Sequence, residues 1–194
     1  TMHPATWPII TELTNGKPRL LSGTLQVDEP GKPSGGRLHC AREDYGWEST
    51  RYEVRDGKIY CDDFVVFPYL DDVLLGDGGL LLLPGSHKSN FERPKTLFSG
   101  GEITGELPPG VINVTPRAGD VLVMPEAMTH GILPWTPEDR IRRILVLRYR
   151  PQHKDSSSGM PEEIKKRLSP ETLELTETGS FKHVKEIVKD KAAA

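Results

Sequence analysis

The sequence has few cysteines, no long apolar run and no surplus of basic residues, and each absence excludes a class of protein. Its two cysteines cannot form a disulfide framework for 194 residues, and they lack the CxxC spacing of a structural zinc site. No stretch approaches the roughly 18 consecutive apolar residues that a membrane-spanning helix needs. The formal net charge is −3 with both signs mixed along the chain. We therefore expect one cytoplasmic domain over residues 1–194, with no nucleic-acid or membrane partner.

Amphipathic helices are absent from the middle of the sequence, which excludes a βαβ array. Short apolar or alternating segments, separated by Gly, Pro and Asp, fill residues 19–151 and predict an all-β jelly roll or sandwich. Asp56-Gly57 predicts a two-residue hairpin turn. The strands are expected at residues 20–27, 51–60 on either side of that turn, 64–70, 80–83, 111–114, 120–124 and 141–149.

Helical patterns appear only at the two ends of the chain. Residues 3–13 have the apolar spacing of a short helix, and Asn15-Gly16 predicts its C-cap. We expect this helix to pack on the outside of the sheet. A C-terminal helical extension is expected over about residues 160–190, with helices at 161–167 and 181–188.

Two of the six histidines lie at opposite ends of the strand region, and three arginines follow the second one. His39 comes early, His130 comes late, and Arg140, Arg142 and Arg143 begin about ten residues after His130. Two imidazoles and a carboxylate on one face of Fe(II) leave positions open for O₂ and a bidentate 2-oxo acid. A planar guanidinium binds the far carboxylate of such an acid in fork geometry. The order of these residues predicts an iron- and 2-oxo-acid-dependent oxygenase.

Several segments resemble the phytanoyl-CoA dioxygenase family, over roughly residues 19–151. They are Tyr69-Leu70-Asp71-Asp72-Val73, Gly76-Asp77-Gly78-Gly79-Leu80, Leu83-Pro84-Gly85-Ser86-His87-Lys88, and Ala118-Gly119-Asp120-Val121-Leu122, which leads to His130 and the strand at 142–149. The resemblance implies a double-stranded β-helix (jelly roll) with short flanking helices. It also implies an Fe(II)- and 2-oxoglutarate-dependent dioxygenase that hydroxylates a C–H bond of a small-molecule substrate.

The resemblance assigns roles to individual residues. It makes His39 the proximal iron ligand, His130 the distal ligand and Arg142 the partner of the 2-oxoglutarate C5 carboxylate. Arg140 and Arg143 remain rivals of Arg142 for that carboxylate. Because side chains alternate along a strand, only one of Arg142 and Arg143 can point into the barrel.

Three aromatic residues are expected to line the rest of the site. Phe67 lies where the family often has an aromatic wall against the cosubstrate. Trp47 follows His39 and Trp135 follows His130 on loops that we expect at the mouth of the barrel, so both are candidates for substrate contact. Packing is the alternative role for each tryptophan.

The family's metal motif is His-x-Asp, but this sequence has His39-Cys40-Ala41, without the carboxylate. In one interpretation Asp44, or its neighbour Glu43, folds back to become the third ligand. In a second, the small Ala41 leaves room for chloride on the iron, as in the related non-haem halogenases. In a third, iron binding is weakened and the barrel is a non-catalytic binding protein. Cys40 is a poor candidate because strand alternation points it away from His39.

Overall fold

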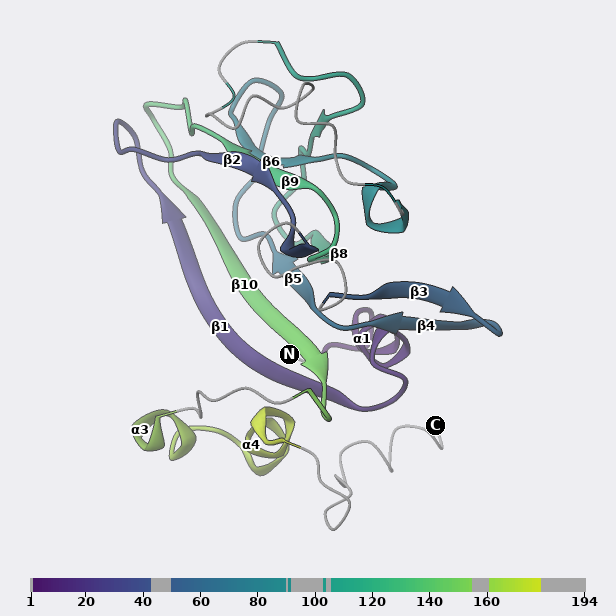
Figure 1. The fold of residues 1–194 in the computed structure, drawn as a ribbon. Coiled ribbons are helices and arrows are strands. Elements are labelled where there is room, and N and C mark those ends of the chain that lie inside the picture. The colour runs from purple at the N-terminus through teal and green to yellow at the C-terminus, as the bar shows by residue number, and fades with distance from the viewer. Residues whose placement is uncertain are drawn as a thin grey trace.

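The structure, a computed structural model, describes residues 2–42, 50–89, 91, 103, 106–154 and 161–178. Two four-stranded antiparallel sheets face each other in it, with a separate hairpin beside them (Figure 1). The first sheet has the order β1 (Pro18–Asp28), β10 (Arg142–Pro151), β5 (Phe64–Pro68), β8 (Val121–Pro125). The second has the order β2 (Gly36–His39), β9 (His130–Leu133), β6 (Gly79–Leu82), β7 (Ile112–Asn113). The predicted jelly roll with short flanking helices is confirmed.

All seven predicted segments contain strands, but two observed strands, β2 and β9, were not predicted. Each has only four residues, and each contains a glycine and a histidine. Such short, partly polar segments are too brief to show a period of two. The longest paired strands in Figure 1 are β1 and β10, and their register joins Pro18 to Pro151 and Asp28 to Arg142.

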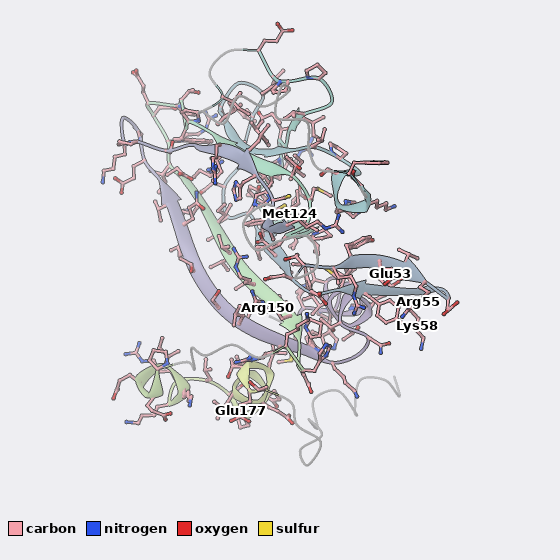
Figure 2. All side chains as sticks on the ribbon, viewed as in Figure 1. Glu53, Arg55, Lys58, Met124, Arg150 and Glu177 are labelled. Atoms are coloured by element: carbon pink, nitrogen blue, oxygen red, sulfur yellow. The ribbon has the colours of Figure 1, made fainter. Side chains whose placement is uncertain are left out.

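The hairpin of β3 (Tyr52–Arg55) and β4 (Lys58–Cys61) turns at the predicted dipeptide. Asp56 and Gly57 both have positive φ, of 52° and 71°, as a type I′ turn requires. Figure 2 shows the hairpin extending away from the sheets with Glu53, Arg55 and Lys58 near its tip.

In the described part of the chain, three short α-helices and one 3₁₀ turn (Ser86–Lys88) accompany the strands. Helix α1 (Trp7–Leu13) ends before Asn15 and Gly16, which have positive φ as the predicted cap requires. Helix α3 (Glu162–Lys165) lies within the predicted segment at 161–167, whereas the helix predicted at 181–188 falls outside the described residues. Helix α4 (Pro170–Thr176) lies within the helical extension expected over about residues 160–190, although no separate helix was expected at these positions. Ser169 caps it by accepting a hydrogen bond from the Thr172 amide. None of the helices in the described part of the chain is long and apolar enough to cross a membrane.

Alternation along β5 separates two hydrophobic clusters. Phe64 and Val66 face outward, and Val65 and Phe67 face the second sheet. The outer cluster contains Trp7, Ile10, Leu13, Leu20, Cys61, Phe64, Val66, Tyr149 and Leu175, so α1 and α4 cover this face as predicted for α1. The inner cluster lies between the sheets and contains Val65, Phe67, Tyr69, Val73, Leu80, Leu82, Met124, Trp135 and Ile144; Met124 is labelled in Figure 2.

Candidate metal and cosubstrate site

His39 and His130 lie directly opposite each other on the paired strands β2 and β9. The centres of their rings are 4.3 Å apart and the ring planes are inclined by 53°. Nδ1 of His39 is 3.0 Å from the carbonyl oxygen of Arg37, and Nδ1 of His130 is 2.8 Å from that of Met128. A carbonyl only accepts, so each hydrogen bond places the ring proton on Nδ1 and leaves the lone pair on Nε2. Both histidines are thus in the tautomer that binds a metal through Nε2.

The Leu83–Lys88 motif holds the strand that carries His130. The hydroxyl of Ser86 donates to the carbonyl of Leu83 at 2.7 Å and accepts from the amide of Thr129 at 2.8 Å. The Leu83 amide in turn donates to the carbonyl of Thr129 at 2.9 Å. Three hydrogen bonds therefore fix the backbone immediately before His130.

Glu126 is a buried carboxylate at this site that the sequence did not reveal. It is 6% exposed, and its Oε2 lies 3.9 Å from Nε2 of His130. Its Oε1 accepts a hydrogen bond from Nη1 of Arg148 at 2.5 Å. Its backbone carbonyl accepts from the amide of Ala41 at 2.9 Å, next to the position where the family motif has its aspartate. The one available signal was the spacing of four residues between Glu126 and His130, which points to no particular chemistry outside a helix.

The third iron ligand predicted from sequence cannot be placed. Asp44 and Glu43 lie outside the described residues, and so does Trp47. Within the described ranges, no three His, Cys, Asp or Glu side chains are already arranged to hold a metal ion. Asp44 as a ligand and Trp47 as a substrate contact therefore stay predictions.

Arg142 points into the barrel, as alternation required for one of the two adjacent arginines. It is 2% exposed, and its Nε and Nη2 lie 2.8 and 2.6 Å from Oδ2 of Asp28. Its neighbour on the same face, Ile144, belongs to the inner cluster. Arg143 faces outward, where its guanidinium binds the carboxylate of Asp71 and lowers the pKa of that group. Of this pair, only Arg142 can meet a ligand between the sheets.

Trp135 is buried beneath two guanidinium groups. The Arg140 and Arg142 guanidinium carbons lie 5.9 and 5.4 Å from its ring centre, within cation–π range. Its indole N–H donates to the carbonyl of Arg140 at 3.0 Å. Nη2 of Arg140 binds the carboxylate of Asp77. Arg140, the other rival of Arg142 for the cosubstrate, is therefore already engaged in an ion pair. Trp135 packs in the core here, and its contact with a substrate stays a prediction.

The surroundings of Arg142 fit a carboxylate ligand. The Tyr69 hydroxyl is buried and has no hydrogen-bond partner among the described residues. Burial raises the pKa of Tyr69 to about 12, against the opposing charge of Arg142, so the phenol remains a neutral donor. Nη1 of Arg142 lies against Gly79, where a Cβ would come within 2.1 Å of it. Phe67, on β5, belongs to the same inner cluster as Tyr69 and adds an apolar wall. A carboxylate held by Arg142 and Tyr69 would satisfy the unpartnered hydroxyl.

The fold is similar to that of a protein from Streptomyces hygroscopicus whose structures contain iron, or nickel with 2-oxoglutarate. The chain is similar to HygX. The iron-bound structure of HygX from Streptomyces hygroscopicus is 28% identical with a TM-score of 0.64, over 77% of this chain and 65% of that one. HygX with nickel and 2-oxoglutarate bound is 26% identical with a TM-score of 0.61, over 77% and 62%. The nickel complex of the non-haem monooxygenase ThoJ, 17% identical over 81% and 54% with a TM-score of 0.56, shares the fold alone.

These likenesses cover only part of each solved protein. The chain spans less than two thirds of the length of HygX and about half of ThoJ. No protein-family model matches the sequence, and a search of curated proteins found no match either.

Proposed function

We propose that the protein is an Fe(II)- and 2-oxoglutarate-dependent oxygenase of the phytanoyl-CoA dioxygenase-like kind, which hydroxylates a C–H bond of a small molecule. The observation that carries the proposal is the facing pair of His39 and His130, each with its Nδ1 hydrogen-bonded to a backbone carbonyl. The likeness to HygX, a protein whose structures hold iron or nickel with 2-oxoglutarate, supports it.

Different residues would bind the iron and the 2-oxoglutarate. His39 and His130 would hold the iron, and the Arg142 guanidinium with the Tyr69 hydroxyl would hold the C5 carboxylate of 2-oxoglutarate. Phe67 would pack on the carbon chain of that acid. Bound iron and 2-oxoglutarate would supply the oxidising chemistry. The protein orients them, and the inner cluster keeps water away from them.

The substrate would enter from the side of the barrel where the loops after His39 and His130 lie. Trp47 and Trp135 are our candidates for contact with it, and Asp44 is our sequence-based candidate for the third iron ligand. The side chain of Ala41 is a buried methyl group, which is compatible with chloride in a halogenase-like site. The hydroxylase is our first alternative and the halogenase our second, because halogenation would also need a halide ion at the iron.

Metal binding and 2-oxoglutarate turnover test this proposal together. The purified chain should bind one Ni(II) by calorimetry, and with Fe(II) it should convert 2-oxoglutarate to succinate, at a rate that chloride does not change. His130→Ala should abolish both, whereas His153→Ala, at an exposed histidine, should change neither. A wild-type chain that binds no divalent metal would refute the oxygenase. A chain that binds metal and 2-oxoglutarate but never forms succinate would instead be the non-catalytic binding protein.

A further inference from the structure

The buried carboxylate of Glu126 has no role in the function proposed so far. We propose that Glu126 supplies the carboxylate of the metal site, in place of the aspartate that the family motif would have at Ala41. The inference rests on the proposed function, because it needs a metal between His39 and His130. It adds a ligand that follows strand β8 instead of strand β2.

Each of the three side chains is supported in the way that metal ligands usually are. The Nδ1 atoms of His39 and His130 bind backbone carbonyls, and Oε1 of Glu126 binds the guanidinium of Arg148. Such outer partners orient metal ligands. The atoms proposed to meet the ion are the two Nε2 nitrogens and Oε2 of Glu126, which lies 3.9 Å from Nε2 of His130.

The contact between Glu126 and His130 favours a cation between them. Oε2 of Glu126 and Nε2 of His130 are both atoms that ligate divalent metals, and they face each other at 3.9 Å. The His130 and Glu126 side chains are only 10% and 8% exposed, so water screens this contact poorly. Ligand bonds of about 2.0–2.2 Å allow one ion to touch two atoms up to about 4 Å apart. A divalent ion can therefore bridge this pair.

The position of Glu126 also explains how Ala41 is tolerated. The Ala41 amide donates to the Glu126 carbonyl at 2.9 Å, so the two residues are hydrogen-bonded neighbours at the end of the barrel. A second carboxylate at position 41 would add another negative charge beside Glu126 in a buried site. A methyl group at position 41 avoids that repulsion and leaves the approach to the histidines open.

Binding of the ion would complete the ligand set. The three groups are not arranged as a finished metal site in the described part of the chain. The Glu126 carboxylate would have to move from its contact with His130 onto the ion, while Arg148 retains its other oxygen. Metal sites commonly form in this way, with ion binding providing the free energy that orders the ligands.

Calorimetric titration of Ni(II) into metal-free protein separates the candidates for the carboxylate. Glu126→Gln keeps the shape and removes the charge, and it should raise the Ni(II) dissociation constant by at least about tenfold. Asp44→Asn tests the rival acid and should leave the constant unchanged. Glu53→Gln, on the exposed hairpin, is the matched control for loss of one negative charge. Loss of affinity in Asp44→Asn, with wild-type affinity in Glu126→Gln, would overturn the inference.

The same titrations keep this inference distinct from the proposed function. If His130→Ala loses the metal and Glu126→Gln keeps it, the oxygenase site stands and the role of Glu126 is wrong. If the wild-type chain binds no Ni(II), the proposed function is refuted, and so is the role of Glu126 that depends on it.

A crystal structure of the Ni(II)-loaded wild-type protein gives a second measurement that needs no variant to fold. A carboxylate oxygen of Glu126 should lie within bonding distance of the ion, beside Nε2 of His39 and Nε2 of His130. A carboxylate from any other residue in that position, or none, would overturn the inference.

Discussion

The outer and inner faces of strands β5 and β10 have opposite chemistry, although alternate residues of the same strands form them. On the outer face, Phe64 and Tyr149 stack with ring centres 5.5 Å apart under helix α1. On the inner face, Tyr69 and Arg142 carry polar groups into the space between the sheets. The period of two therefore lets one pair of strands provide packing on one side and a binding site on the other.

The two faces also differ in how their burial is compensated. The outer face gains free energy from apolar contact, which needs no particular partner. A buried guanidinium needs an acid and further hydrogen bonds, because the loss of its hydration otherwise exceeds the attraction to its partner. Asp28 supplies that acid for Arg142 at the far end of β1. The following substitutions test whether changes on the outer face affect only stability, while changes on the inner face also affect ligand binding.

The largest effect is expected from Arg142→Met. Loss of the guanidinium leaves the Asp28 carboxylate buried without its partner, which should lower the free energy of unfolding by about 3–5 kcal/mol. The variant should also lose 2-oxoglutarate binding, measured by calorimetry with Ni(II) present. Adding Asp28→Asn should restore much of the stability, measured by urea unfolding, but not the binding. Wild-type 2-oxoglutarate affinity in the single variant would exclude Arg142 as the anchor.

A loss of stability without loss of function is expected from Phe64→Ala. Removing this fully buried ring should lower the free energy of unfolding by about 3–5 kcal/mol, because the packed outer cluster cannot fill the cavity that the ring leaves. The Ni(II) affinity of the folded fraction should be unchanged. Leu75→Ala, at a side chain that is 90% exposed, is the control and should alter stability by less than about 0.5 kcal/mol. A large change of Ni(II) affinity in Phe64→Ala would show that the two faces are coupled.

The smallest effect compares two buried tyrosines, one on each face. Burial raises the pKa of Tyr69 from 10.0 to about 12 and also raises that of Tyr149. The stability that a raised pKa provides is complete below pH 10 and is lost as the pH rises through the folded-state value. Tyr69 should therefore account for a loss of about 1.4 kcal/mol between pH 8 and pH 11.

Tyr69→Phe and Tyr149→Phe should both weaken this alkaline loss in urea unfolding. Only Tyr69→Phe should reduce 2-oxoglutarate affinity, because only its hydroxyl lies on the inner face. Equal affinities in the two variants would remove Tyr69 from the proposed cosubstrate site.

Most of the fold could be predicted because its signals are local. Alternating apolar residues marked the longer strands, and the same alternation correctly placed Arg142 and Arg143 on opposite faces. The strands that carry His39 and His130 were missed because four residues are too few to show a period. Their histidines were selected by order and resemblance, without any view of the pairing that places the rings 4.3 Å apart.

The sequence by itself determined the jelly-roll class and the alternation of faces, and its order of residues and family resemblance suggested His39, His130 and Arg142 as candidate ligands. The alternation follows from periodicity, which is local. Only the tertiary structure showed that Asp28 neutralises Arg142, that Trp135 packs beneath two arginines, and that Glu126 lies beside His130 and Ala41. These contacts join residues that are distant along the chain or meet across a turn, so their partners are chosen by sheet pairing and by the cost of burying unpaired charge.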